Sequence, residues 1–345
     1  MRFLFISICC FINYSTFGQP ALSKVGEPGM ATQIHFIPTS FSNLFTLNLP
    51  PVLRIQSGDT VSTETIDAAG YDKNSLKRQK GGNPLTGPFY IENALEGDVI
   101  GITLIQVALN RSYAFTSESF VSRSLPKAVV KQFTKSRPVK WKLDTLTGFA
   151  TLMDTSYPHL QSFRVPLRPF LGCIGVAPAV KNNEILSFFQ GPFGGNMDFS
   201  GVAKSATVYL PVFHDGGYLY IGDGHALQGD GEIAGNALET SLNVAFTVRV
   251  IKKENVSLTY PRVEDSVYLM AVGIDKSLDK AIKRATVGLL EWLQADYHLS
   301  LQEATQVLST SIEYTIAEIA DPEVEIVAKI KKGLVGNTGY PSQKK

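Results

Sequence analysis

Four side chains able to act as acids, bases or metal ligands lie within ten residues of one another. Asp223, His225, Asp230 and Glu232 belong to the stretch 221–232, here called the central loop, which also contains four glycines. Glycine lets the backbone turn tightly and adopt positive φ at low cost. Carboxylates and an imidazole on such a loop between two strands predict a polar site on a rigid frame. The alternative is a surface hairpin in which aspartate and glycine only form turns.

Other polar side chains stand in loop-like segments elsewhere in the chain. Asp67, Asn83, Asn196 and Asp198 lie in short polar stretches close to glycine, between apolar runs. His35 lies in a short strand-like run near the N-terminus. Side chains from separate loops of a β scaffold can meet in one cavity, so these residues are candidates to join the central loop. For Asn196 and Asp198 the alternative is simple turn capping.

Cys173 is the third and last cysteine of the chain and lies inside the apolar run 170–176. A catalytic cysteine needs neighbours that lower its pKa, and nothing nearby in the sequence would do so. The pattern therefore favours a buried structural thiol over a nucleophile.

The elements that position these residues are mostly strands. Alternating apolar and polar residues recur before residue 275, and the unit of strand, Gly-Asp turn and strand occurs twice, around Asp59 and Asp98. After Asp275 the period changes to that of a helix, and Ser300 to Glu303 has the spacing of a capping box. This order predicts an α+β fold, predominantly β, with a sandwich- or barrel-like scaffold and a C-terminal helical pair.

One domain is predicted over residues 19–335. Its parts are a β-rich portion, a helical pair and a closing strand, followed by a flexible tail. The predicted boundaries are 30–274 for the β-rich portion, 276–320 for the helical pair, 323–331 for the closing strand and 336–345 for the tail.

The first 18 residues have the pattern of a secretory signal peptide. Arg2 precedes the apolar run 3–12, and small residues stand before a predicted cleavage site near Gly18. A run of that length is too short to span a bilayer, so cleavage is favoured over an uncleaved anchor. The expected location is therefore outside the cytoplasm, periplasmic or secreted, with no membrane association after cleavage. Cys173 would then be the single cysteine of the mature chain, which excludes an internal disulfide.

Composition narrows the function further. Hydrophobic residues make up 44% and charged residues 18% of the chain, and the net charge is +1. These values are those of a folded globular protein, and no basic block predicts binding to nucleic acid.

Taken together, the polar loops resemble the acetamidase/formamidase family. The motifs that carry the resemblance occur in the family's order and span roughly residues 33 to 330. They are Pro51–Val61, Pro84–Pro88, Arg168–Pro178, Gly194–Asp198 and Gly222–Glu232. The resemblance implies a β-rich fold with a late helical pair, an associated metal, and hydrolysis of short amides to a carboxylate and ammonia.

Two positions depart from the pattern of the family's amidases. Those proteins often carry a histidine pair near the N-terminus and a histidine before the Pro-x-Thr-Gly-Pro motif. This chain has only His35 in the first place and Asn83 in the second. Either a ligand has been lost or this branch uses an amide group there.

Amide hydrolysis assigns a role to each candidate. It needs an activated nucleophile, an oxyanion stabiliser and an acid for the leaving nitrogen. No Gly-x-Ser-x-Gly motif is present, so an activated water remains. We expect Glu232 to be the general base and His225 to be a metal ligand or the proton donor. The remaining assignments are Asp230 as a catalytic orienter, Asn83, Asn196 and the N–H groups of Gly229 and Gly231 as substrate-binding groups, and Asp67, Asp198, Asp223 and His35 as metal ligands beside His225.

Three functional hypotheses follow from the sequence. The first is an exported hydrolase of small carboxamides, with a divalent metal, zinc or calcium, as its candidate cofactor and homo-oligomer formation left open. The second is a non-catalytic secreted β module that binds Ca²⁺ or a carbohydrate through the same acidic loops. The third is a C–N hydrolase of a cyclic or larger amide, in which residues 71–82 and 111–140 reshape the pocket. The histidine at the centre of the loop favours catalysis, because calcium prefers oxygen ligands alone.

Overall fold

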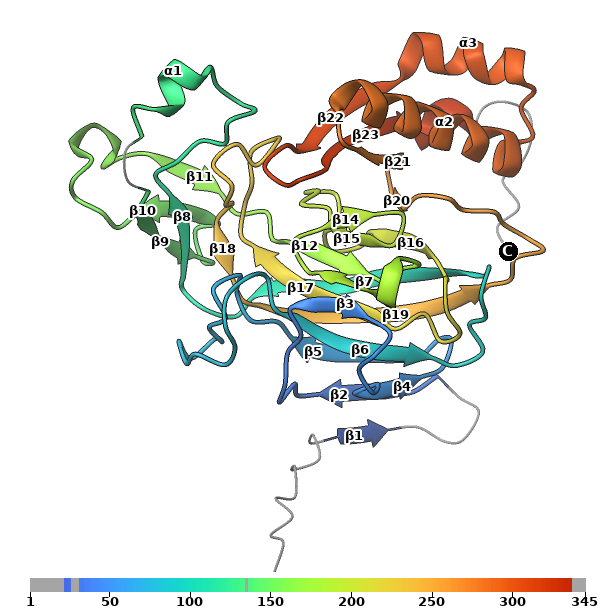
Figure 1. Ribbon diagram of the computed structural model, residues 1–345, viewed down its shortest axis with the longest axis horizontal. Coiled ribbons are helices and arrows are strands. Elements are labelled where there is room, and N and C mark those ends of the chain that lie inside the picture. The colour runs from blue at the N-terminus through green and yellow to red at the C-terminus, as the bar shows by residue number, and fades with distance from the viewer. Residues whose placement is uncertain (1–21, 26–30, 134–135, 337–345) are drawn as a thin grey trace, which may run out of the picture.

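The computed structural model describes residues 22–25, 31–133 and 136–336. The predicted signal peptide and nearly all of the predicted tail lie outside the described residues. Figure 1 shows a body of stacked strands, with helices α2 and α3 above its C-terminal strands and the short α1 at the opposite end.

One of the two large sheets of the β body contains ten strands, counted over the described residues. All of its pairings are antiparallel except that of β2 with β5. In order across the sheet the strands are β1 (Leu22–Val25), β2 (Gln33–Phe36), β5 (Thr60–Glu64), β19 (Leu242–Ile251), β7 (Val99–Leu109), β16 (Thr207–Pro211), β20 (Arg262–Glu264), β21 (Tyr268–Asp275), β23 (Val324–Lys331) and β22 (Glu313–Glu318).

The second sheet contains eleven strands within the same described ranges and carries most of the candidate residues. Its main path is β11 (Arg164–Pro166), β10 (Phe149–Leu152), β9 (Pro138–Asp144), β8 (Tyr113–Ser117), β18 (Glu239–Thr240), β17 (Leu219–His225), β12 (Phe170–Gly175), β15 (Gly194–Asn196) and β14 (Gln190–Gly191). Strand β6 (Leu85–Ile91) also pairs with β17, and β4 (Leu53–Ile55) pairs with β6. A small separate pair joins β13 (Glu184–Leu186) to β3 (Leu44–Thr46).

The main hydrophobic core lies between these two sheets. Phe36 of β2 and Phe246 of β19 both pack edge-on against Phe89 of β6, at ring-centre distances of 5.6 and 5.5 Å. Such aromatic pairs contribute about 0.5–1.5 kcal/mol each beyond the burial of their surface. The predicted α+β class with a β-dominated sandwich is confirmed, and over the described strands both sheets are open paths that do not close into a barrel.

The C-terminal helices cover the end of the ten-stranded sheet, as Figure 1 shows. Helix α2 (Leu278–Tyr297) packs on β21 and β23, and α3 (Leu301–Ser311) follows it. Gly273 of β21 permits this close approach, because an added Cβ would lie 2.1 Å from the carbonyl oxygen of Ala281. The helical pair is confirmed, and so is the capping box between Ser300 and Glu303. Four short helical segments complete the list within the described ranges: α1 (Lys127–Val130), α4 (Lys332–Val335) and the 3₁₀ turns Pro158–Leu160 and Lys181–Asn183.

The helical region ends earlier than predicted. It was expected to run to residue 320, but β22 occupies residues 313–318 and pairs with β23. The apolar residues Ile316 and Ala317 do not distinguish strand from helix over so short a stretch, and sheet pairing decided the outcome. The closing strand, predicted over 323–331, is β23 and lies between two neighbours. No helix in the described ranges is both long and apolar enough to cross a bilayer.

The two Gly-Asp turns have the same local geometry. In each turn the aspartate N–H donates to the carbonyl three residues earlier, and its carboxylate accepts the N–H of that same earlier residue. The N–H of Gln56 donates to Oδ2 of Asp59, and the N–H of Leu95 donates to Oδ2 of Asp98, each at 2.9 Å. These acids therefore serve the backbone.

Candidate active site

Strand β17 places a histidine and an aspartate in the interior of the protein. Every residue of this strand is buried, because strands flank it and packed segments cover both of its faces. His225 is the register partner of Phe170 on β12 and of Glu239 on β18. Its ring packs edge-on against Phe170 at 4.8 Å, and its Nε2 lies 3.2 Å from Oε1 of Glu239. The imidazole is thus held by neighbours on both sides of its strand.

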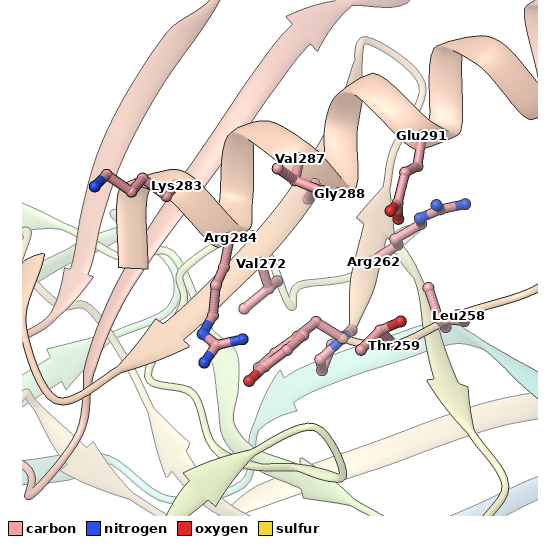
Figure 2. A pocket seen from close by; sticks show the side chains of 12 residues that line it. Leu258, Thr259, Arg262, Val272, Lys283, Arg284, Val287, Gly288 and Glu291 are labelled. Carbon is pink, nitrogen blue, oxygen red and sulfur yellow. The ribbon is translucent and has the colours of Figure 1, made fainter. Parts of the chain in front are cut away.

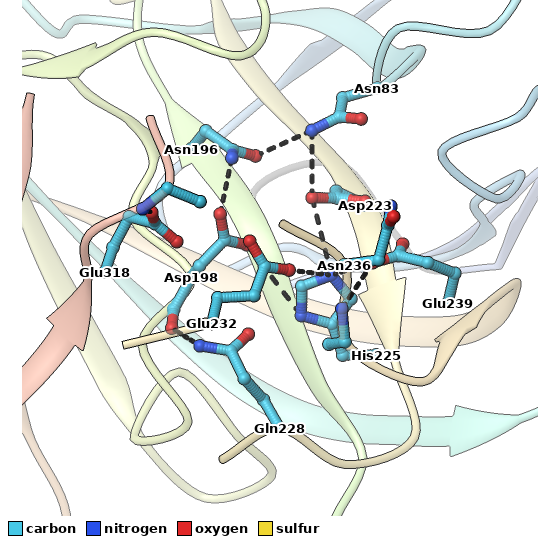
Figure 3. A network of polar contacts seen from close by, with 12 residues as sticks. Asn83, Asn196, Asp198, Asp223, His225, Gln228, Glu232, Asn236, Glu239 and Glu318 are labelled. Atoms are coloured by element: carbon cyan, nitrogen blue, oxygen red, sulfur yellow. Dashed lines mark hydrogen bonds and ion pairs between the residues drawn. The ribbon is translucent and has the colours of Figure 1, made fainter. Parts of the chain in front are cut away.

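Three further carboxylates approach the same imidazole. Asp223 Oδ2 lies 3.5 Å and Glu232 Oε1 lies 3.9 Å from His225 Nε2. Asp198 Oδ1 lies 3.8 Å from Nδ1 on the other side of the ring. His225 is fully buried and none of these acids is more than 8% exposed. Figure 3 shows the four carboxylates converging on the ring from different segments.

Two amide side chains and a thiol lie beside this cluster. Asn83 donates through Nδ2 to Oδ1 of Asn196 at 3.0 Å and to Oδ2 of Asp223 at 3.1 Å. Asn196 in turn donates to the carboxylate of Asp198. Cys173 donates to Asn196 Oδ1 at 2.6 Å, and burial raises the pKa of its thiol well above the usual value. A thiol that stays protonated is a poor nucleophile.

A glycine on β12 leaves the room that the cluster occupies. A Cβ added at Gly172 would lie 2.4 Å from Asp198 Oδ1, 2.8 Å from Asp223 Oδ2 and 3.0 Å from His225 Cε1. Any side chain at this position would therefore displace the groups that converge there. Glycine is required here for space.

The central loop is fixed to the C-terminal part of the chain. The backbone of Gly231 donates to Ala317 and accepts from Ile319 across β22, at 3.2 and 3.0 Å. Gln228 donates through Nε2 to the carbonyl oxygen of Asp198 at 2.6 Å. At the end of β22, Glu318 interacts with Glu232, and Asp321 accepts a hydrogen bond from Asn196 at 2.9 Å. The site is therefore completed by Glu318 and Asp321, which lie far along the chain from the central loop.

Burial shifts the acid–base behaviour of this cluster. It raises the pKa of Asp198 and Glu232 well above their ordinary values, and the pKa of Glu239 to about 7. Glu318 and Asp321 are raised to about 7 and about 8 for the same reason. Burial by itself lowers the pKa of His225, but the negative charges of Glu239 and Asp223 outweigh it, so that pKa is raised well above its usual value.

The donor set fits a divalent cation. Two groups share the histidine, Asp198–His225–Glu232 and Asp223–His225–Glu239, and within each group the ligand atoms lie within 4.8 Å of one another. Both ring nitrogens of His225 are buried without a hydrogen-bond partner among the described residues, and so is one oxygen of each of Asp198, Asp223 and Glu239. Unpaired buried polar atoms cost stability, and a cation would satisfy them. Histidine nitrogen with carboxylate oxygen suits zinc better than calcium.

Asp67 and His35 do not join the cluster, contrary to the metal-ligand prediction. Asp67 forms a buried ion pair with Arg111 at 2.7 Å, and its other oxygen accepts the N–H of Tyr71. Arg111 also donates to the carbonyl oxygen of Glu239 at 3.2 Å, so this pair supports β18. His35 has an exposed side chain on β2, in the opposite sheet.

The central loop itself divides into buried and exposed parts. Asp230 and Gly229 are exposed, so the predicted orienting role of Asp230 has no structural support. The N–H of Gly231 donates to the carbonyl oxygen of Ala317, so it is not free to bind an oxyanion as predicted. Glu232, after the turn, is 8% exposed and faces His225.

Three acids of the site were missed from the sequence. Glu239 lies two residues into an apolar run, where a single acid gives no motif. Glu318 and Asp321 fall in the region predicted to be helical. The alternation of β22 (Glu313–Glu318) was the available signal, because a strand ending beside the central loop would carry its last residues to the site.

A hollow lies next to the segment that carries Glu232. It has a volume of about 440 Å³ and is bordered by the aromatic side chains of Phe120, Phe133 and Tyr157. Ala234, two residues after Glu232, also borders it. The segment 117–121 is tied to this part of the chain by hydrogen bonds from Ser119 and Val121.

Known proteins match this chain in sequence and in structure. The model of the Acetamidase/Formamidase family matches residues 32–186 and 192–330. A formamidase from Methylophilus methylotrophus is 29% identical over 148 residues, which are 37% of this chain and only 36% of the relative. The crystal structure of an acetamidase from Bacillus halodurans is 26% identical with a TM-score of 0.74, covering 89% of this chain and all of the other.

A second crystal structure, of an acetamidase from Yersinia enterocolitica, is 27% identical with a TM-score of 0.76 and covers 90% of this chain and 96% of the other. The family model covers most strands of both sheets and helices α2 and α3, together with every residue of the cluster around His225. The chain therefore belongs to the acetamidase/formamidase family.

Proposed function

We propose that this protein hydrolyses small linear carboxamides to a carboxylate and ammonia. The observation that carries the proposal is the buried group of carboxylates around His225. Both ring nitrogens and one oxygen each of Asp198, Asp223 and Glu239 have no hydrogen-bond partner among the described residues. Family membership and the names of the related formamidase and acetamidases support the same substrate class. The burial of the cluster favours a substrate of few atoms.

We propose zinc as the cofactor, and His225 with the carboxylates of one of the two ligand groups would hold it. When bound, zinc lowers the pKa of water to about 7 and polarises a carbonyl. The cation also offsets the repulsion among Asp198, Asp223 and Glu239, which burial would otherwise leave uncompensated.

The protein's own residues handle the protons and the orientation of the amide. Glu232 takes a proton from the attacking water and delivers one to the leaving nitrogen, so that ammonia departs and the carboxylate remains. Asn83, fixed by Asn196 and Asp223, presents its carbonyl oxygen to a substrate N–H. The substrate reaches the site from the hollow beside Ala234.

We also propose that the protein acts outside the cytoplasm. The support is the sequence alone: Arg2 followed by the apolar run 3–12, with small residues at 16 and 18. N-terminal sequencing of the protein recovered from periplasm or medium tests this, and a chain beginning at Met1 would overturn it.

The activity is tested by ammonia release from formamide, acetamide and longer amides. In Glu232→Gln we expect the rate to fall at least about 100-fold, the lower end of general acid–base contributions. The melting temperature should not fall, because a neutral amide replaces a buried carboxyl of the same shape. The matched control is Asp230→Asn, the same chemical change on the same loop at an exposed position, and it should retain the wild-type rate.

Two outcomes would contradict the proposal. Wild-type turnover by Glu232→Gln would remove that residue from the mechanism. Failure of the wild-type protein to release ammonia from any amide, together with a melting temperature that falls on chelation, would support a metal-binding module without catalysis.

A further inference from the structure

A second cavity lies under helix α2. It has a volume of about 270 Å³ and is bordered by α2, by β21 and by the segment 258–262 that leads into β20. Figure 2 shows the helix passing above it and Arg262 and Arg284 among the side chains that line it. None of its lining residues belongs to the cluster around His225.

One wall of this cavity contains a buried arginine that has no carboxylate within hydrogen-bonding reach, although the negative charges of Asp296 and Glu291 act on it from farther away. Arg262 is only 5% exposed, and its Nε has no hydrogen-bond partner among the described residues. No carboxylate in the described ranges lies within 4.0 Å of it, and its guanidinium packs on the ring of Trp292 at 5.1 Å. Burial lowers the pKa of Arg262 from its ordinary value. A buried, unpaired cation costs stability and is uncommon in a structure that does not use it.

The rest of the lining combines positive charge with apolar surface. Lys283 and Arg284 line the cavity from α2, and Arg284 is held by Asp275 at 2.7 Å. Glu291 is the single acidic side chain of the lining, and with Arg284 paired to Asp275 it stands against two further cations, Arg262 and Lys283. Val272 and Val287, with other apolar side chains, make up most of the remaining wall.

We propose that this cavity is a binding site for a small organic carboxylate with an apolar body. The planar guanidinium of Arg262 matches a carboxylate, and the apolar wall accommodates a short hydrocarbon or aromatic group. Inorganic phosphate would meet the charge but leave the apolar wall unfilled. A neutral amide would leave Arg262 without a counter-ion.

Trp292 provides a readout of this site alone. The chain has two tryptophans, so Trp141→Phe leaves Trp292 as the only one. In that background we expect benzoate and butyrate to change Trp292 fluorescence saturably, and butyramide and phosphate to bind at least about tenfold more weakly.

The decisive variant is Arg262→Met, which keeps the length of the side chain and removes the charge. We expect it to bind benzoate at least about tenfold more weakly, to melt at the wild-type temperature or above without ligand, and to release ammonia at the wild-type rate. Lys280→Gln, the same loss of charge on α2 outside the cavity, should bind normally. Equal binding of benzoate by Arg262→Met, or of butyramide by the unaltered site, would overturn the proposal. So would a fluorescence curve that does not saturate.

Discussion

Two groups of buried aspartates in this protein have opposite surroundings. Asp98, in the turn 95–98, accepts hydrogen bonds from the N–H groups of Leu95 and Lys253 and pairs with Lys252 at 2.8 Å. Asp198, beside His225, is as deeply buried but has an oxygen without a hydrogen-bond partner among the described residues.

The pKa shifts follow the partners. Burial alone would raise both values, but Lys252 and the backbone donors bring the pKa of Asp98 below its ordinary value. Asp198 accepts a hydrogen bond from Asn196 and lies beside the His225 imidazole, but burial and the neighbouring acids outweigh them and its pKa is raised. Burial therefore does not mark a functional acid. A buried carboxylate oxygen that has no donor does, because such an acid is left able to bind a cation or a proton.

The largest effect is expected from filling the space between the site acids. Gly172→Ala places a Cβ 2.4 Å from Asp198 Oδ1 and 2.8 Å from Asp223 Oδ2, so both carboxylates must move. Displacement of about 1 Å can cost about 100-fold in rate, and we expect kcat/KM for a small amide to fall by at least that factor.

The control for this variant is Gly229→Ala. It lies on the central loop with no atom within 4 Å of the added Cβ, so its rate should be that of the wild type. A Gly172→Ala protein that remained fully active would show that the convergence of the acids is not needed for catalysis.

The second largest effect is expected from metal removal, which should affect the acids around His225 but not Asp98. Chelation should abolish ammonia release and lower the melting temperature, and Zn²⁺ at 100 times its Kd should restore about 2.7 kcal/mol of stability. Asp98→Asn should keep this metal response, whereas Asp223→Asn should lose it, as measured by thermal unfolding and elemental analysis. Full activity of a metal-free protein would contradict the assignment.

A smaller effect is expected at the turn. Asp98→Asn removes a charged acceptor of two backbone N–H groups and the partner of Lys252, so we expect it to lower the free energy of unfolding by about 1.5–3 kcal/mol. The rate per folded molecule should not change. Urea unfolding, with ammonia release on the same samples, measures both quantities.

The contribution of Asp98 to the free energy of unfolding should depend on pH. Because the folded-state pKa of Asp98 is lowered, its stabilisation is present above the unfolded value of 3.8 and is lost as the pH falls through the folded value. The difference between wild type and Asp98→Asn should therefore be full at pH 6 and shrink below pH 4. In metal-free protein, Asp198→Asn should not destabilise at pH 6. A large loss there would show that Asp198 is structural, like Asp98.

The sequence predicted what local pattern determines. Alternation and a capping box predicted a β-rich chain with a late helical pair, and glycine-flanked polar residues predicted the meeting of His225 with Asp198 and Glu232. Asp67 has the same appearance as these residues, but its partner Arg111 lies 44 positions away, and only the folded chain pairs them. That pairing could not be read from spacing.

The acids that were missed have a common cause. Glu239 reaches His225 through the register of β18 with β17, and Glu318 reaches Glu232 through the pairing of β22 with the central loop. Sequence patterns identify faces of strands but not which strands become neighbours. Nonlocal pairing therefore hid half of the carboxylates.

The bridge between Gly231 and Glu318 also bears on how the protein is made. A chain that has emerged from the ribosome only as far as residue 300 already contains His225 and the acids closest to it. It still lacks β22, which fixes the central loop, and the Asp321 carboxylate, which accepts a hydrogen bond from Asn196. Because the site is complete only after the last strands have been synthesised, we expect translation products that stop short of them to be inactive even where their first sheets have formed.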